Sequence, residues 1–210
     1  GMRTQAERAA AFRTLHERPG AFIIPNPWDA GTAKLLAALG FEALATTSLG
    51  FAASLGRPDG AGAVSRRELL DNCAAIASAT DLPVSADLEN CYAHEPRAAA
   101  QMISLAAQAG VVGGSIEDAT GDERKPIYDF QLAVERVQAA VEAARSLGFA
   151  FVLTARAENF LHGRRDLDDT IRRLQAFEKA GADVLYAPGL WDLATIRTVA
   201  ASVARPLNVV

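Results

Sequence analysis

The chain of 210 residues lacks the features that mark several classes of protein. Cys73 and Cys91 are its two cysteines, which are too few for a disulfide framework and do not have the spacing of a metal-binding motif. No apolar run approaches the length of a membrane span, and the first twenty residues are charged and amphipathic rather than a signal peptide. These absences predict a cytoplasmic protein in a reducing compartment.

The chain also lacks a block of basic residues. It contains 21 Lys and Arg against 25 Asp and Glu, which gives a formal net charge of −4 and a pI near 5.4. This balance argues against nucleic acid or an anionic membrane surface as the main partner. We therefore expect a small molecule as the partner.

The nucleotide-binding motifs are missing as well. The first expected strand is followed by the sequence "IPNPWDAGTAK", which contains no G-x-G-x-x-G, and no later strand leads into a Walker A sequence. The chain also shows no Gly-rich phosphate loop or Schiff-base lysine after the sixth or seventh strand, which weakens the case for a phosphate-dependent barrel isomerase or aldolase.

What the chain does have is an alternation of short β-branched segments with longer Ala-rich segments of helical spacing. The expected strands cover residues 21–27, 43–48, 82–89, 111–118, 151–158, 183–189 and 205–210. The expected helices include residues 30–40, 65–80, 96–110 and 166–181. Gly40, Gly110, Gly148 and Gly181 each precede a strand, as expected of a left-handed residue that ends a helix. This pattern predicts a parallel sheet in an α/β protein.

Two architectures fit such a sheet: a doubly wound open sheet and a (β/α)₈ TIM-type barrel. The missing dinucleotide motif favours the barrel. We expect one domain over residues 1–210, with seven strands visible and the eighth missing, so that the chain is either truncated at the C-terminus or completed by a partner subunit. The long loops 49–64 and 119–129, rich in Gly, Pro and charge, indicate the functional side and are expected to close over a ligand.

Acidic residues end several of the expected strands. In a barrel the carboxyl ends of the strands meet at one face, so these side chains should converge. The polar strand ends are Asn26 and Asp29, Thr46, Thr47 and Ser48, Asp87 and Glu89, Glu117 and Asp118, Arg156 and Glu158, and Tyr186. Carboxylate oxygens without His or Cys nearby suit Mg²⁺ or Mn²⁺. The sequence therefore predicts a hard-cation site.

Less specific interpretations stay open for the same residues. Asp87 and Glu89, two apart on a strand, project from one face about 7 Å apart, and in isolation they would be a solvated strand end. Arg156 could form a structural ion pair with Glu158 or Glu117. Glu117 and its neighbour Asp118 face opposite sides, and we prefer Glu117 as the ligand. No histidine is placed like a catalytic base, and Trp191 is expected to seal a helix on the barrel.

Four segments carry a resemblance to a known family. In order, they read "PNPWDAGTAKLLAALGFEALATTSLG", "PVSADLENCY", "GGSIED" and "LTARAENF". Together they resemble the isocitrate lyase and phosphoenolpyruvate mutase superfamily over nearly the whole chain. The resemblance implies a Mg²⁺-dependent (β/α)₈ enzyme that makes or breaks a C–C or P–C bond next to a carboxylate through an enolate-like intermediate. It also implies a homodimer or homotetramer in which the last helix is handed to a neighbouring subunit.

The resemblance assigns roles by motif. It implies Asp87, Glu89 and Glu117 as acids of the metal site, Thr47, Ser48 and Leu49 as the loop that holds a substrate carboxylate, and Arg156 as the substrate-binding arginine. It further implies Asp59 in "GRPDG" as a pocket acid and Trp28 as a residue that packs over the ligand. A turn residue remains the alternative for Asp59.

The departures from the family are informative too. The loop 119–129 reads "ATGDERKPIYD" instead of the K-[KR]-C-G-H motif of the isocitrate and methylisocitrate lyases, so cleavage of a 2-hydroxy tricarboxylate is disfavoured. Lys125 is the one residue of this loop that we consider as a substrate contact. Cys91 stands where the family usually has Gly and is expected to narrow the pocket. The sequence favours an enzyme acting on a small 2-oxo carboxylate; the alternative is a non-catalytic member that binds a metal or ligand.

Overall fold

The computed structural model describes residues 1–60 and 62–210, and within these residues the chain forms eight α-helices and one six-stranded parallel sheet. The helices are α1 (Gln5–Glu17), α2 (Ala30–Ala38), α3 (Ser48–Ser54), α4 (Arg66–Ala79), α5 (Pro96–Gln108), α6 (Phe130–Arg145), α7 (Leu167–Lys179) and α8 (Leu193–Ala201), with a 3₁₀ helix η1 (Asn159–His162). The strands are β1 (Leu44–Ala45), β2 (Val84–Asp87), β3 (Gly113–Glu117), β4 (Val152–Arg156), β5 (Val184–Tyr186) and β6 (Leu207–Asn208).

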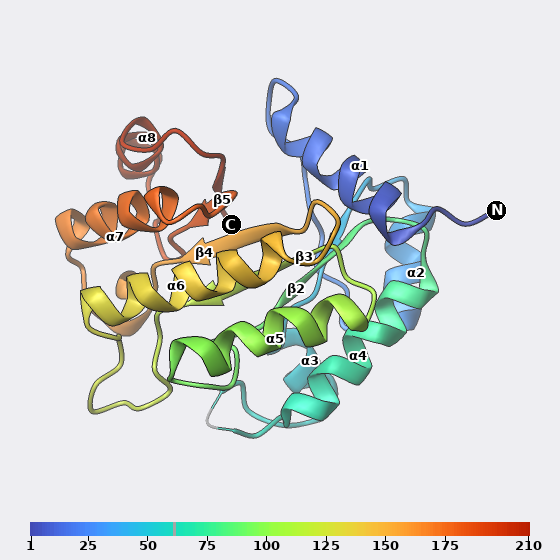
Figure 1. Cartoon of the computed structure of the whole chain (residues 1–210), viewed down its shortest axis with the longest axis horizontal. Coiled ribbons are helices and arrows are strands. Elements are labelled where there is room, and N and C mark those ends of the chain that lie inside the picture. The colour runs from blue at the N-terminus through green and yellow to red at the C-terminus, as the bar shows by residue number, and fades with distance from the viewer. Residues whose placement is uncertain (61) are drawn as a thin grey trace.

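The sheet follows the chain order from β1 to β6, and every neighbouring pair is parallel. The helices contact one another in the same order on the outside of the sheet, from α2 and α4 through α5 and α6 to α7, as Figure 1 shows for the front of the molecule. The sheet curls like part of a TIM barrel. The predicted α/β class and parallel sheet are confirmed, whereas the eight-strand count is not.

The first expected strand is wrong. Residues 21–27 belong to no strand of the described chain. The segment lies beside β1, where the N–H of Ala45 donates to the carbonyl of Pro25 (3.1 Å) and the Asn26 amide donates to the carbonyl of Ala45 (3.1 Å). Pro25 and Pro27 have no N–H group, so a regular ladder cannot continue through them.

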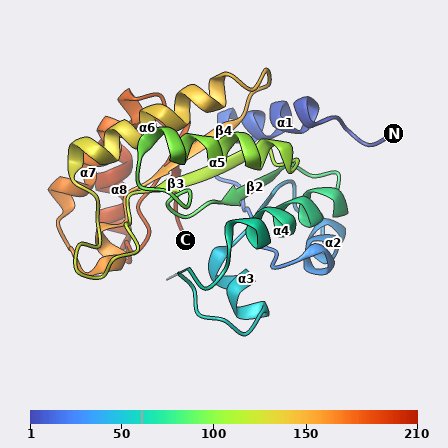
Figure 2. The same ribbon diagram turned by 60° about the horizontal axis from the view of Figure 1, so that its bottom comes forward.

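The predicted loop 49–64 is also only partly a loop. Residues 48–54 form α3, which begins at the cap residue Thr47. In Figure 2, α3 lies below α4 and β2, apart from α5 and α6. Residue 61 of this predicted loop lies outside the described residues.

The helix ends agree with the sequence. The four glycines expected to be left-handed have φ values of 92° (Gly40), 105° (Gly110), 78° (Gly148) and 110° (Gly181). Each therefore turns the chain back toward the next strand with a backbone conformation that costs glycine little.

The two faces of the sheet bury different kinds of side chain. The face toward the helices carries apolar residues, including Leu88, Ile116, Leu153 and Leu185. Because side chains alternate along a strand, polar residues such as Ser85, Ser115 and Thr154 project from the opposite, concave face. The concave face can therefore hold a polar site without exposing the apolar core.

Helix α1 closes the concave face at the amino ends of the strands. Its Phe12 is 2% exposed and packs in a cluster with Val112, Val152 and Val184, which start or immediately precede their strands. Figure 1 shows α1 at the end of the sheet where β4 begins. The polar residues at the carboxyl ends lie at the other end. No helix in the described part of the chain is long and apolar enough to span a membrane.

Candidate active site

The carboxylate of Asp87 lies at the centre of a polar group at the carboxyl ends of the strands. Its Oδ2 accepts a hydrogen bond from the N–H of Ser48 (3.1 Å), and its Oδ1 accepts one from the N–H of Glu89 (3.0 Å). The N–H of Asp87 donates to the hydroxyl of Thr46 (3.0 Å). Asp87 is thus held by the segments that follow β1 and β2, and 15% of its side chain remains exposed.

Arg156 extends from the end of β4 to the same place. In the sheet register it pairs with Glu117 of β3 and Tyr186 of β5, so these three side chains project from one face. Its Nη2 lies 2.9 Å from Oε1 of Glu158, its Nη1 lies 3.8 Å from Oδ1 of Asp87, and its guanidinium carbon lies 4.9 Å from the centre of the Tyr186 ring. Burial lowers the pKa of Arg156, but the charges of the neighbouring carboxylates raise it by more. The pKa of Arg156 is therefore above its ordinary value.

Glu117 and Glu158 form a buried pair of acids beside this arginine. Burial raises the pKa of Glu117 well above its ordinary value, and the charge of Glu158 adds to the shift. Oε1 of Glu158 pairs with Arg156, while its Oε2 is buried with no hydrogen-bond partner in the described residues. The predicted structural pair between Arg156 and Glu158 is therefore present.

Asp118 points to the other side of the sheet, as expected from strand alternation. It is 2% exposed, and it accepts hydrogen bonds from the N–H of Glu158 (2.8 Å) and from Nη1 of Arg173 (3.0 Å). Burial raises the pKa of Asp118 to about 6. The separation of Glu117 from Asp118 is confirmed; the role of Glu117 as a metal ligand stays a prediction.

Glu89 lies in a turn rather than on a strand. Strand β2 ends at Asp87, and Glu89, Cys91 and Tyr92 have φ values of 53°, 62° and 57°. The expected strand alternation of Asp87 and Glu89 is therefore wrong. The hydroxyl of Tyr92 donates to Oε2 of Glu89 (2.7 Å), and burial raises the pKa of Glu89. No glycine marks this left-handed turn in the sequence, so the pattern of residues could not reveal it.

The start of α3 lies next to Asp87. The hydroxyl of Thr47 accepts a hydrogen bond from the N–H of Gly50 (3.2 Å) and so caps α3. The N–H of Ser48 donates a hydrogen bond to the carboxylate of Asp87. The Trp28 ring packs against this turn, because a Cβ on Gly50 would lie 2.7 Å from Nε1 of Trp28. Leu49 is 63% exposed.

Asp59 belongs to the same group. It lies near enough to Ser48, Asp87 and Arg156 for each to influence its pKa. Burial raises the pKa of Asp59 and the like charge of Asp87 adds to this, whereas the contacts with Ser48 and Arg156 oppose the shift. The structure thus brings Trp28, Thr47, Ser48 and Asp59 to the neighbourhood of Asp87 and Arg156.

Three other expected residues lie elsewhere. The ammonium group of Lys125 forms an exposed ion pair with Asp129 (3.0 Å), so its contact with a substrate stays a prediction that requires loop movement. Cys91 is 1% exposed within the apolar core and does not line a pocket; burial raises the pKa of its thiol to about 12. Trp191 is 84% exposed and does not seal a helix on the sheet, which corrects the expectation.

The charge balance of the group suits a cation. Its acids Asp59, Asp87, Glu89, Glu117 and Glu158 surround the single guanidinium of Arg156, and one buried carboxylate oxygen lacks a partner among the described residues. Within residues 1–60 and 62–210, no three acidic, histidine or cysteine side chains converge as a ready set of direct ligands. The donors fit a hard cation that one carboxylate binds directly and others approach through water.

A family model, solved structures and curated proteins are similar to this chain over most of its length. The chain matches the family model described as phosphoenolpyruvate phosphomutase over residues 12–210. A solved structure named "putative lyase/mutase" from Burkholderia cenocepacia J2315 is 61% identical with a TM-score of 0.95, covering 98% of this chain and 73% of that chain. A structure of oxaloacetate acetylhydrolase in complex with the product oxalate is 27% identical with a TM-score of 0.89, covering 98% of this chain and 72% of that chain. "Probable 2-methylisocitrate lyase 2" of Corynebacterium glutamicum is 30% identical, covering 96% of this chain and 66% of its own length.

Proposed function

Because the chain belongs to the phosphoenolpyruvate mutase/isocitrate lyase superfamily, we propose that it is a Mg²⁺-dependent enzyme that forms or cleaves a C–C or P–C bond in a small 2-oxo carboxylate through an enolate-like intermediate. The observation that carries the proposal is the meeting of Asp87, Glu117 and Arg156 at the carboxyl ends of three neighbouring strands. A single structural ion pair would not need several acids around one arginine.

The metal would be held by Asp87 directly and by Glu89 and Glu117 through water. A bound Mg²⁺ or Mn²⁺ would supply positive charge that stabilises a developing enolate by on the order of a few kcal/mol in a site closed to water. Binding through water fits the structure, since the described residues do not place three acids close enough together to bind one metal ion directly.

The other residues have roles that follow from their contacts. Arg156 is the cation that binds the substrate carboxylate, because its guanidinium lies beside the carboxylates of Asp87 and Glu158. Thr47, Ser48 and Leu49 present the start of α3 to the oxygens of the substrate, and Trp28 covers that turn. Asp59 is the candidate for proton exchange, because it lies beside Ser48 and Asp87 and its pKa is raised from the ordinary value by burial.

The substrate class is a small acid such as oxaloacetate, a substituted malate or phosphonopyruvate. Relatives named as lyases and hydrolases favour bond cleavage over isomerisation. The loop 119–129 lacks the cysteine motif of the tricarboxylate lyases, which argues against 2-methylisocitrate. A non-catalytic protein that keeps the metal site remains the alternative, and a phosphate-dependent barrel isomerase or aldolase has no phosphate loop in this chain to support it.

A substrate screen tests the proposal. The protein would be incubated with Mg²⁺ and a panel of 2-oxo and 2-hydroxy acids, with pyruvate and oxalate measured as products. We expect turnover of at least one acid that EDTA abolishes and that the Asp87→Asn variant lacks. Tight Mn²⁺ and oxalate binding without turnover of any acid in the panel would instead favour the non-catalytic alternative.

A further inference from the structure

A buried arginine lies outside the group of site acids. Arg136, in the middle of α6, is 1% exposed, and within the described part of the chain it forms no ion pair with a carboxylate. Its guanidinium donates instead to three backbone carbonyls, those of Ala93 (2.5 Å), Asn90 (2.6 Å) and His94 (2.6 Å). Burying a charge is unfavourable unless hydrogen bonds compensate it. The buried guanidinium therefore indicates that its hydrogen bonds to these carbonyls have a role.

The three carbonyls belong to the turn of residues 89–94. This turn follows β2 and contains Glu89, Cys91 and Tyr92 in the left-handed region, where side chains other than glycine are strained. Within the turn, the N–H of Tyr92 donates to Oδ1 of Asn90 (3.1 Å) and the hydroxyl of Tyr92 donates to Oε2 of Glu89 (2.7 Å), while the N–H of Cys91 donates to the carbonyl of Leu88 just before it (2.8 Å). Arg136 adds three bonds that reach the turn from a rigid helix.

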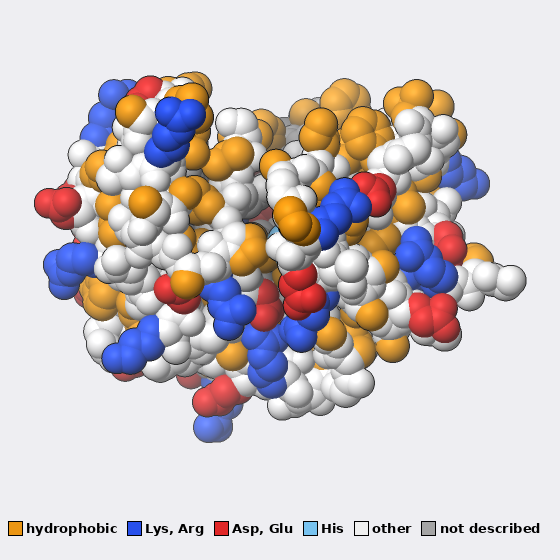
Figure 3. Space-filling view, turned by 90° about the horizontal axis from the view of Figure 1, so that it is seen from above, with side chains coloured by type: hydrophobic (Ala, Val, Ile, Leu, Met, Phe, Trp, Pro, Cys, Tyr) orange, Lys and Arg blue, Asp and Glu red, His pale blue; other side chains and the backbone are white. Residues whose placement is uncertain are grey.

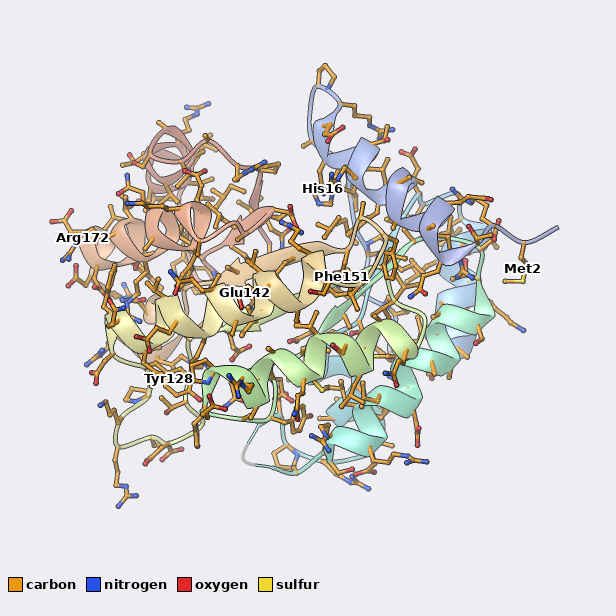
Figure 4. All side chains as sticks on the ribbon, viewed as in Figure 1. Met2, His16, Tyr128, Glu142, Phe151 and Arg172 are labelled. Carbon is orange, nitrogen blue, oxygen red and sulfur yellow. The ribbon has the colours of Figure 1, made fainter. Side chains whose placement is uncertain are left out.

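The ring of Tyr128 packs against the guanidinium of Arg136. The guanidinium carbon of Arg136 lies 4.2 Å from the centre of the Tyr128 ring. The hydroxyl of Tyr128 contacts Nδ1 of His94 (2.6 Å) and Nδ2 of Asn90 (3.4 Å). Figure 4 shows Tyr128 at the end of the molecule where α5 and α6 begin. Arginine and tyrosine together therefore hold both ends of the turn.

The same contacts reach the loop over the site. Tyr128 closes the segment 119–129, and Nδ2 of Asn90 donates to the carbonyl of Thr120 at its other end (3.3 Å). The conformation of the turn and the position of this segment are consequently linked through Asn90.

We propose that Arg136 is a positioning residue: it fixes the turn 89–94 so that the carboxylate of Glu89 stays beside Asp87, and with Tyr128 it links this turn to the segment 119–129. The proposal rests on the proposed function, because the carboxylates that Arg136 positions are the ones assigned to the metal. It adds a residue that lies outside the motifs of the sequence and touches neither metal nor substrate.

Two variants of Arg136 and one control test this role. Arg136→Met removes the donors and keeps an apolar chain of similar length, and Arg136→Lys keeps the charge with fewer directed donors. Arg145→Met is the control, since Arg145 lies on the same helix and also binds carbonyls (Gly181, Phe151), but at the opposite end of α6 from the site. Each variant would be compared with the wild type for Mn²⁺ affinity by calorimetry, thermal unfolding in EDTA, and kcat and KM.

We expect Arg136→Met to weaken Mn²⁺ binding by about 10-fold to 100-fold, as loss of a residue that supports metal ligands does, with Arg136→Lys between it and the wild type. Arg145→Met should lower the melting temperature yet bind Mn²⁺ within about 2-fold of the wild type. If Arg136→Met does not fold, Arg136→Lys and Tyr128→Phe decide, and both should show weakened Mn²⁺ binding.

The outcomes separate the two proposals. A wild-type protein that binds no Mn²⁺, even with oxalate, contradicts the proposed function itself. Wild-type binding that is unchanged in the folded Arg136 variants, or weakened equally by Arg145→Met, overturns the positioning role and leaves the metal site intact.

Discussion

At the scale of single residues, Asp87 has the most specific surroundings. Two backbone N–H groups and Arg156 face its carboxylate. Replacing Asp87 by Asn keeps the shape and removes the charge, so we expect metal affinity to fall by on the order of 100-fold, while the melting temperature in EDTA changes little. Calorimetry with Mn²⁺ and thermal melts in EDTA measure both. Unchanged affinity together with a lower melting temperature would make Asp87 a structural partner of Arg156.

His16 provides a second prediction at this scale. Its ring packs edge-on against Phe12 and Phe22, with centroids 4.7 and 4.9 Å away, and Figure 4 shows it beneath α1. Burial lowers the pKa of His16 below 6.5, although its bond to Phe12 and the charge of Asp183 oppose this shift. Because the folded state binds this proton less well than the unfolded chain, the contribution of His16 to stability is complete above about pH 6.5 and is lost as the pH falls through the folded pKa.

Urea unfolding at pH 7.5 and pH 5.0 checks this sign. We expect the free energy of unfolding to fall more between these pH values in the wild type than in His16→Gln. His162→Gln, at an exposed position, should behave like the wild type. Equal pH dependence in wild type and His16→Gln would show that His16 does not contribute.

The sequence could place some of these residues and not others. The sequence could predict that Asp87, Glu117 and Arg156 lie together, because parallel strands bring their carboxyl ends to one edge of the sheet. The hydrogen bond from Tyr92 to Glu89 and the contacts of Arg136 could not be predicted, because they depend on a left-handed turn built without glycine. An arginine on an amphipathic helix also looks the same in sequence whether it faces water or the core.

At the scale of elements, β3 shows how closely strands and helices approach. A Cβ on Gly113 would lie 2.9 Å from the carbonyl oxygen of Val152 and 3.0 Å from the ring of Phe12. Since a backbone atom cannot move aside easily, we expect Gly113→Ala to destabilise the protein by about 1–3 kcal/mol. Gly31→Ala in α2 is the control, because its nearest neighbour is an ordinary 3.6 Å away. Urea unfolding of both variants decides, and equal stabilities would contradict the steric argument.

The segment 119–129 gives a prediction about motion. It is folded on itself through bonds such as that from the Thr120 hydroxyl to the carbonyl of Lys125 (2.5 Å), while the side chains of Arg124 and Lys125 are 92% and 61% exposed. If the segment closes over the ligand, Mg²⁺ with oxalate should slow trypsin cleavage after Arg124 several-fold; the bond after Lys125 is not a trypsin site, because Pro126 follows it. Cleavage after the exposed Arg165 serves as the control. Equal protease sensitivity with and without ligand would argue against closure.

Element boundaries were predictable where a local cause is visible in the sequence. Gly40, Gly110 and Gly181 directly follow the cap residues of their helices in the left-handed conformation, as expected, and Gly148 lies two residues after the cap of α6. Residues 21–27 looked like a strand by composition, yet two prolines prevent the ladder. Helix α3 could not be predicted, because a segment of seven residues that includes a glycine is too short to show the apolar spacing of a helix.

At the scale of the whole molecule, apolar side chains remain on the surface. Trp191 is 84% exposed, Leu193 59% and Leu161 52%, and Figure 3 shows hydrophobic side chains spread over the face that carries α1 and α8. We expect this surface to be covered by another copy in a homodimer or homotetramer. Sedimentation velocity should show a species larger than the monomer, and Trp191→Ser should shift it toward the monomer, while Leu39→Ser, at the exposed residue that follows α2, serves as the comparison. A monomer at all concentrations would contradict the expectation.

The closure of the amino end by α1 has a kinetic consequence. Phe12 and the valines around it fill the concave face at the amino ends of the strands, so a ligand beside Asp87 has no path through that end of the described structure. If the proposed reaction splits one substrate there, and both fragments leave by the carboxyl ends of the strands, the outer fragment departs before the deeper one, which lies nearer α1. Product inhibition should then be competitive with the substrate for the deeper fragment and noncompetitive for the outer one, so steady-state patterns report which half of the substrate lies against Asp87.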